Sequence, residues 1–175
     1  ASLSKKKIKK IIQISSSEVY GNNLVKNKNI LTEETITISE SPYAATKIAS
    51  DNLAISMQKA TGLPIVVARP FNTFGPYQSE KAIIPEIILK CIQNKDIKTT
   101  AGRQTREFNY VENIIDGILF LDKKIKHSLM PINIGSNTPI SIKELVKKIH
   151  NYSGSSSKLR IGSIKYRPNE IWKMQ

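Results

Sequence analysis

The sequence predicts an α/β protein built around a parallel sheet. Short runs rich in Ile and Val alternate along the chain with longer segments whose apolar residues recur with helical spacing. No internal repeat interrupts this alternation. At 175 residues the chain is long enough to bury a substantial core, as one domain or as half of a larger one.

The expected elements follow from local signals. We expect strands near residues 8–14, 64–68, 108–111, 132–134 and 159–161, and helices near 41–61, 84–92, 114–121 and 140–149. Polar residues 22–40 predict a long loop. Ser41 and Pro42 should begin the first helix and Gly62 should end it. The apolar stripe of that helix is predicted at Ala45, Ile48, Ala49, Leu53 and Met57.

Two further boundaries are marked by special residues. Arg69 and Pro70 are expected to end the second strand, and residues 72–77 carry turn chemistry. Ser141 should open the last helix. Trp172 and Met174 are expected to pack at the edge of a sheet.

Composition narrows the function classes. The 27 basic and 14 acidic side chains give a net charge of +13, but only five of the basic residues are Arg, the usual reader of phosphates and bases. A nucleic-acid partner is therefore not expected, and the lysines at 5–7, 9 and 10 are interpreted as a solvated flank rather than a polyanion site. No apolar run is long enough for a membrane span, and one Cys and two distant His predict neither a disulfide nor a metal site.

One tyrosine–lysine pair stands out by its context. Tyr43 and Lys47 lie one helical turn apart at the start of the first helix, so an ammonium can sit beside a phenol and favour its ionised form. The same spacing recurs at Tyr77 and Lys81, where a turn after Gly75 offers no helix face. Only the first pair is predicted to be functional.

Residues 15–21 (Ser-Ser-Ser-Glu-Val-Tyr-Gly), the Tyr43–Lys47 helix and residues 69–76 (Arg-Pro-Phe-Asn-Thr-Phe-Gly-Pro) resemble the extended short-chain dehydrogenase/reductase family. These are NAD-dependent nucleotide-sugar epimerases and dehydratases. The resemblance continues in family order through residues 105–111, 133–135 and 167–170. It implies the C-terminal portion of a Rossmann-like parallel sheet plus a smaller substrate-binding subdomain, without the glycine-rich NAD loop that the family places upstream.

The resemblance also implies a division of labour among residues. Tyr43 would take the proton of the sugar 4-hydroxyl, and Lys47 would hold the nicotinamide ribose. Ser16 would bond the same sugar oxygen, beside Ser17 and Glu18, and Ser15 and Phe71 would line the cofactor pocket. The substrate, a nucleotide diphosphate sugar, would be bound by Asn72, Ile83, Ile84, Pro85, Arg106, Arg167 and Glu170.

The reaction itself stays open at this level. A 4,6-dehydratase needs a carboxylate that removes the C5 proton and expels the C6 hydroxyl, and Glu18 fits that need. The family's dTDP-glucose 4,6-dehydratases carry Thr-Asp-Glu where this chain has Ser16-Ser17-Glu18. A 4-epimerase or a UDP-glucuronate decarboxylase is the alternative within the family, and a non-catalytic basic binding module is the alternative of another class.

The same resemblance implies an organisation for the whole protein. Residues 1–70 would complete the NAD-binding domain, and residues 71–175 would form most of the sugar-binding subdomain, interleaved with the last elements of the first. A cytoplasmic homodimer is expected. The start at Ala1 predicts that the chain is cropped from a longer protein.

Overall fold

The structure is a computed structural model that describes residues 8–22, 30–168 and 170–174. Its helices are α1 (Pro42–Thr61), α2 (Ile83–Ile92), α3 (Val111–Lys124) and α4 (Ile142–Ser153), with one 3-10 turn, η1 (Ser17–Tyr20). Its strands are β1 (Ile11–Ile14), β2 (Ile65–Pro70), β3 (Thr73–Phe74), β4 (Ile97–Thr99), β5 (Thr105–Glu107), β6 (Asn109–Tyr110), β7 (Ile132–Ile134), β8 (Pro139–Ser141), β9 (Leu159–Ile161) and β10 (Lys173–Met174).

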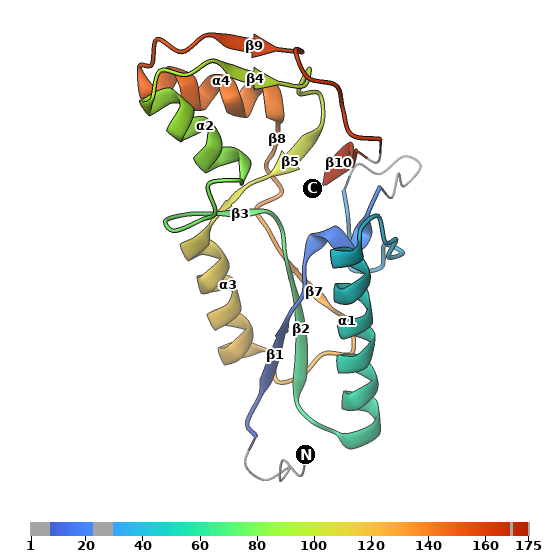
Figure 1. The fold of residues 1–175 in the computed structure, drawn as a ribbon. Coiled ribbons are helices and arrows are strands. Elements are labelled where there is room, and N and C mark those ends of the chain that lie inside the picture. The colour runs from blue at the N-terminus through green and yellow to red at the C-terminus, as the bar shows by residue number, and fades with distance from the viewer. Residues whose placement is uncertain (1–7, 23–29, 169, 175) are drawn as a thin grey trace.

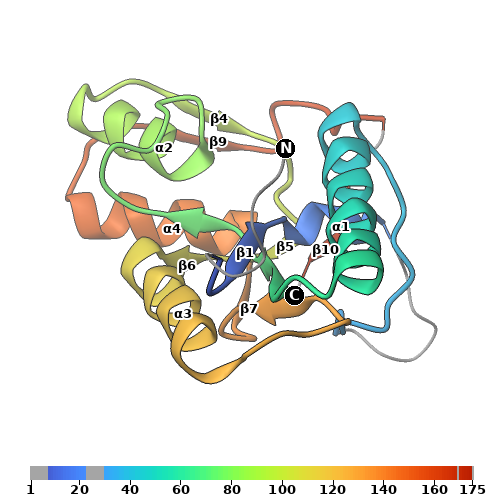
Figure 2. The same ribbon diagram turned by 90° about the horizontal axis from the view of Figure 1, so that it is seen from below.

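A parallel sheet in the order β1-β2-β7 forms the centre of one half of the molecule. Helix α1 covers one face of this sheet and α3 covers the other (Figures 1 and 2). Alternate residues of β2 serve the two faces: Ile65 and Val67 pack with Ala54 of α1, and Val66 and Ala68 pack with Leu121 of α3. Burial on both faces explains the unbroken apolar run of this strand, and the predicted α/β class is confirmed.

The other half holds the remaining helices and short strand pairs. Helices α2 and α4 lie beside the parallel β4–β9 pair (Figure 1), and Ile87, Ile97 and Val146 are the centre of their shared core. Strand β5 runs between β10 and β8, and the β5–β8 pairing is antiparallel. Five short strands, β3, β4, β5, β8 and β10, were not predicted, because their two or three residues lack the pattern of a polar residue between two apolar ones that β7 and β9 have.

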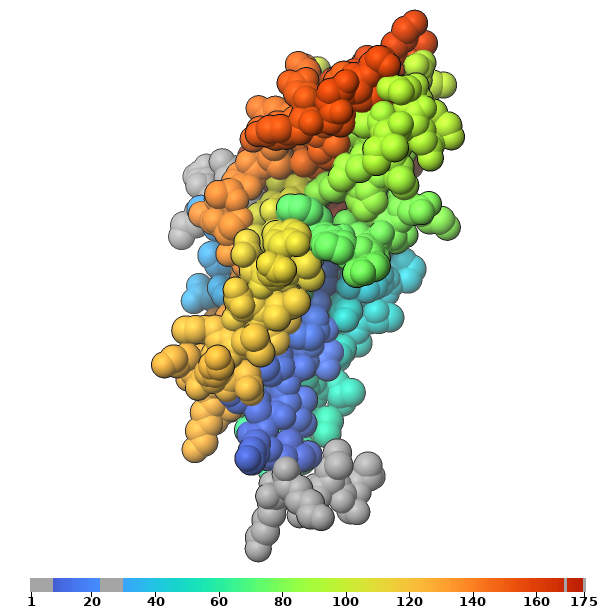
Figure 3. Space-filling model, turned by 90° about the vertical axis from the view of Figure 1, so that its left-hand side faces the viewer, coloured from blue at the N-terminus to red at the C-terminus, as the bar shows by residue number. Residues whose placement is uncertain are grey.

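Strand β1 is an edge strand within the described part of the chain, since its pairing there is with β2 alone. It comes to the surface between α3 and α1 on the face drawn in Figure 3. The lysines at 5–7 lie outside the described residues. None of the helices in the described ranges combines the length and apolar character that a bilayer crossing requires.

The ends of helix α1 agree with the prediction. The Ser41 hydroxyl accepts from the backbone N–H of Ala44, Pro42 is the first helical residue, and Gly62 has the left-handed φ of 67° that ends the helix. Helix α4 begins later than predicted, because residues 139–141 form β8 and Ser141 caps Ile142–Ser153.

The predicted apolar stripe of α1 is wrong at four of its five positions: Ile48 packs against the core, whereas Ala45, Ala49, Leu53 and Met57 are exposed. The buried residues are Ala44, Asp51, Ala54 and Gln58, whereas Leu53 and Met57 are 63% and 43% exposed. The side facing the sheet includes polar residues whose partners come from elsewhere in the fold, so hydrophobic periodicity selects the opposite side.

The predicted end of the second strand is also wrong. Strand β2 continues through Arg69 and Pro70, which pair with Asn133 and Ile134 of β7. Arg69 can occupy a buried strand position because its guanidinium is bonded inside the protein, as described below. The predicted strand at 108–111 is shorter, and Val111 belongs to α3.

Candidate active site

The carboxyl ends of β1, β2 and β7 lie side by side, and the predicted site residues follow them directly. Residues Ser15 to Glu18 come after β1, and Phe71 and Asn72 come after β2. In open α/β sheets this edge is where ligands bind. The sheet therefore gathers segments that lie more than fifty positions apart in the sequence.

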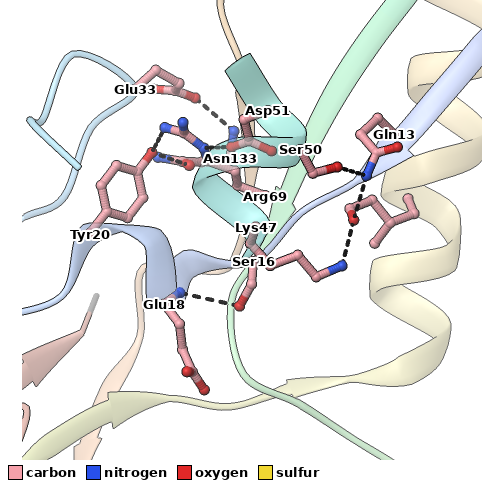
Figure 4. Close-up of polar contacts among 11 residues, drawn as sticks. Gln13, Ser16, Glu18, Tyr20, Glu33, Lys47, Ser50, Asp51, Arg69 and Asn133 are labelled. Atoms are coloured by element: carbon pink, nitrogen blue, oxygen red, sulfur yellow. Dashed lines mark hydrogen bonds and ion pairs between the residues drawn. The ribbon is translucent and has the colours of Figure 1, made fainter. Parts of the chain in front are cut away.

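The turn after β1 places Ser16 and Glu18 differently from Ser17. The Ser16 hydroxyl accepts a hydrogen bond of 3.2 Å from the backbone N–H of Glu18 and caps η1. Ser17 is buried, and its hydroxyl donates to Sδ of Met174 over 3.2 Å. The Glu18 side chain points away from Tyr20 and Arg69 (Figure 4). Of the three predicted residues, Ser17 is thus the one packed into the core.

Helix α1 presents the tyrosine–lysine pair beside this turn. Lys47 Nζ donates to the carbonyl oxygen of Ile14, the last residue of β1, over 2.9 Å (Figure 4). The same ammonium lies 5.7 Å from the centre of the Tyr43 ring. Tyr43 is half exposed, so its phenol is open to a ligand. The second pair has no comparable setting, because Tyr77 lies in a turn with a φ of 64° and is fully exposed.

Most of the predicted substrate residues line one cavity of about 410 Å³. Its walls include Glu18, Asn72, Arg106, Arg167 and Glu170. A neighbouring cavity of about 250 Å³ is lined by Asn72, Arg106 and the apolar side chains of Ile83, Ile84 and Phe108. Pro85 is not among the residues that line either cavity. Phe108 was missed by the sequence analysis as a wall residue, although its apolar side chain beside Arg106 was a usable signal.

Arg106 joins the cavities and is held firmly. Its Nη2 lies 3.0 Å from Oε1 of Glu170, and its Nη1 donates to the carbonyl oxygen of Thr105. Burial lowers the pKa of Arg106, while the charges of Glu170 and Glu18 oppose that shift. The result is a preformed cationic group shared by a cavity that carries carboxylates and a cavity whose walls are partly apolar.

A buried polar cluster lies behind the site, and sequence analysis gave it no role. Arg69 Nε donates to Asp51 Oδ2 over 2.9 Å, and its Nη1 donates to the Tyr20 hydroxyl over 3.1 Å. The Tyr20 hydroxyl donates to Asn133 Oδ1 over 2.7 Å (Figure 4). Burial raises the pKa of Tyr20, against the lowering effect of Arg69. The four residues come from α1, η1, β2 and β7.

Within the described ranges, no group of three or more His, Cys, Asp or Glu side chains is arranged to hold a metal ion. The wall of the larger cavity described above carries charges of both signs, from Glu18, Glu40 and Glu170 and from Arg106 and Arg167. An organic, anionic ligand suits this arrangement, since Arg106 and Arg167 supply planar multiple donors.

Comparison with known proteins identifies the class. Residues 1–135 match the model of the NAD dependent epimerase/dehydratase family, and the chain belongs to this family. It is 32% identical over 156 residues to a dTDP-D-glucose 4,6-dehydratase of Dictyostelium discoideum, covering 84% of this chain and 36% of that protein. It is 34% identical over 159 residues to a UDP-N-acetyl-alpha-D-glucosaminuronate decarboxylase of Bacillus cytotoxicus, covering 86% of this chain and 48% of that protein.

Solved structures agree with this fold. A UDP-N-acetylglucosamine 4-epimerase from Methanobrevibacter ruminantium superposes with a TM-score of 0.86 at 30% identity, over 96% of this chain and 54% of that one. The chain thus spans half or less of the length of the curated relatives described above. The predicted family and Rossmann-like fold are confirmed, whereas the division near residue 70 stays a prediction.

Proposed function

We propose that this chain forms the substrate side and the catalytic centre of an NAD-dependent nucleotide-sugar 4,6-dehydratase. The observation that carries the proposal is that Glu18 lines the same cavity as Arg106, Arg167 and Glu170. A carboxylate there stands beside the groups suited to a sugar diphosphate. A dehydratase requires a carboxylate at this position, because a base must remove the C5 proton and an acid must protonate the departing C6 hydroxyl.

The residues near Lys47 fit the nicotinamide end of NAD. The Lys47 ammonium has three donors and uses one on the carbonyl of Ile14, and ribose hydroxyls are acceptors that suit the others. The Ser15 hydroxyl is buried and has no hydrogen-bond partner among the described residues. The Phe71 side chain packs in the core with Val19 and Tyr20, so its backbone would line the cofactor pocket. When bound, NAD would supply the acceptor and donor of hydride at the sugar.

The other side chains have separable roles. Tyr43 would accept the proton of the sugar 4-hydroxyl, with the Lys47 ammonium 5.7 Å from the centre of its ring, and Ser16 would bond the same oxygen. Arg106 and Arg167 would hold the diphosphate, Asn72 would contact it, and Glu170 would read a ribose hydroxyl. Ile83 and Ile84 with Phe108 would wall the base, and the buried Ser17 would keep the turn in place.

A 4-epimerase is the second candidate, favoured by one observation. The family's dTDP-glucose 4,6-dehydratases have an acid at the middle position of this turn, whereas Ser17 is packed against Met174 here. Epimerisation at C4 removes and returns hydride without an acid or base at C5. A decarboxylase would need a substrate with a C5 carboxylate.

The Glu18→Gln substitution tests the proposal in the protein encoded by the complete reading frame, assayed with a panel of nucleotide hexoses in deuterated water. A dehydratase should still oxidise C4 but stop eliminating water, so the 4-keto sugar accumulates without deuterium at C5. Full turnover by the variant, with no deuterium at C5 in the wild type, would favour the epimerase. Release of carbon dioxide from a uronic acid substrate would establish the decarboxylase.

We also propose a homodimer in the cytoplasm. The exposed face of α1, with Ala45, Ala49, Leu53 and Met57 one turn apart, supports an apolar contact with a second copy.

A further inference from the structure

Arg69 lies at the only place in the described ranges where a buried arginine meets a buried aspartate. Side-chain exposure is 6% for Arg69 and 2% for Asp51. Such a pair pays a large desolvation cost, and replacing it by apolar residues is often neutral or stabilising. Stability alone is therefore a weak reason for this ion pair, so we consider which elements of the fold it connects.

The contact of Arg69 with Asp51 connects the guanidinium to the helix that carries Tyr43 and Lys47. Asp51 follows Lys47 by four residues and Tyr43 by eight, so the three lie along one side of α1. Asp51 Oδ1 has no partner among the described residues, so the bond to Arg69 is what fixes this carboxylate. Through the Arg69–Asp51 bond, the sheet fixes the rotation of α1 about its axis and its position along that axis.

The contact of Arg69 with Tyr20 connects the same guanidinium to the turn that carries Ser16 and Glu18. Tyr20 is the last residue of η1 and is fully buried. Its hydroxyl accepts from Arg69 Nη1 and donates to Asn133, and the Arg69 guanidinium lies 5.0 Å from its ring centre. The position of Glu18, two residues earlier, is thus tied to the same guanidinium (Figure 4).

We propose that Arg69 is a positioning residue that sets the placement of Tyr43 and Lys47 relative to Ser16 and Glu18. It contacts Asp51 on one element and Tyr20 on the other, and touches none of the four residues that it aligns. The effect that this positioning should have on the reaction rate rests on the proposed function. Displacements of about 1 Å between reacting groups can lower a rate by ~100-fold, which makes such a shared anchor consequential.

Three substitutions separate the contact of Arg69 with Asp51 from its contact with Tyr20. Tyr20→Phe removes only the hydroxyl, Asp51→Asn neutralises only the helix partner, and Arg69→Met removes both contacts. Because Arg69→Met leaves a buried carboxylate unpaired and can prevent folding, the two milder variants carry the test. Val146→Ala, in the core of the other half, is the control for lost stability, and Arg160→Met removes the exposed Arg160–Asp96 pair.

Kinetics of the protein from the complete reading frame provide the first measurement. Tyr20→Phe and Asp51→Asn should each lower kcat at least about tenfold and leave KM within about threefold, because the substrate groups at Arg106 and Arg167 are untouched. The double variant should lose less than the product of the two single losses, since both act through Arg69. Unchanged kcat, a loss equal to that of Val146→Ala at matched stability, or strict additivity would overturn the proposal.

Hydrogen–deuterium exchange is the second measurement and does not depend on catalysis. In Asp51→Asn the amides of residues 17–21 should exchange at least about threefold faster, although the substitution is on α1; Arg160→Met should leave them unchanged. If the wild-type protein turns over no nucleotide sugar, the proposed function fails and this readout decides the role of Arg69 alone. Unchanged exchange at residues 17–21 would then reject the coupling between the two elements.

Discussion

Arg106 Nη2 and Glu170 Oε1 lie 3.0 Å apart, although 64 positions separate the two residues in the chain. The carboxylate thus orients the guanidinium that we expect to bind the diphosphate. Both side chains are largely buried, at 15% and 14% exposure, so their attraction is only partly screened by solvent. The Glu170 carboxylate therefore offsets part of the positive charge that Arg106 and Arg167 bring to the cavity.

Replacing Glu170 by Gln should therefore act oppositely on two ligands. Inorganic pyrophosphate should bind roughly threefold or more tightly, since one nearby negative charge is removed. A nucleoside diphosphate should bind more weakly, because the ribose hydroxyl exchanges a charged carboxylate acceptor for the weaker amide oxygen. Isothermal titration calorimetry measures both; equal tightening for both ligands would contradict a ribose contact at Glu170.

Replacing Arg106 by Met should weaken binding of a nucleoside diphosphate by about tenfold or more, because a multidentate cationic donor is lost. Arg160→Met is the matched control, since that exposed arginine also pairs with a carboxylate and lines neither cavity described above. Binding titrations at two salt concentrations provide the measurement. Equal losses in the two variants, with a steep salt dependence, would instead favour a general polyanion surface.

The tyrosine pairs offer an internal comparison. Tyr43→Phe should lower turnover by about two orders of magnitude or more, because the ring stays while the proton acceptor is lost. Tyr77→Phe should leave turnover unchanged, since that side chain is fully exposed in a turn. Steady-state rates of the two variants check this expectation. A comparable loss in both would argue against the assignment of Tyr43.

Helix α4 should carry an acid-dependent contribution to stability. Glu144 completes a capping box with Ser141, and the hydrogen bonds from Ser141 lower the pKa of the Glu144 carboxyl from its ordinary value of 4.5. A lowered pKa in the folded state means that this stabilisation is present above pH 4.5 and is lost as the pH falls through the folded-state value. Urea denaturation at several pH values should show a smaller acid loss in Glu144→Gln than in wild type.

The proposed dimer contact on the exposed face of α1 can be tested by introducing a charged side chain there. Leu53→Glu should shift the protein from dimer to monomer, because the carboxylate would be buried in an apolar contact. Ile92→Glu is the control, as Ile92 is similarly exposed at the end of α2. Light scattering coupled to size exclusion measures the mass. A dimer that survives Leu53→Glu would place the contact elsewhere.

The sequence by itself determined the α/β class, the caps of α1 at Ser41 and Gly62, and the segments that supply the site. These rest on local chemistry: a hydroxyl that accepts a helix N–H, a glycine at positive φ, and β-branched runs that pack on both faces of a sheet. Motif order was enough to indicate the family, because its residues follow strands whose carboxyl ends meet.

The tertiary structure alone decided which face of α1 is buried and why β2 continues through Arg69. Periodicity treats a polar residue as exposed, yet Asp51 and Arg69 are buried because their opposite charges pair across 18 positions of the chain. The same holds for Arg106 and Glu170, and for Ser17 against Met174. Such pairings depend on distances between remote segments, and only the folded chain brings these side chains within bonding range.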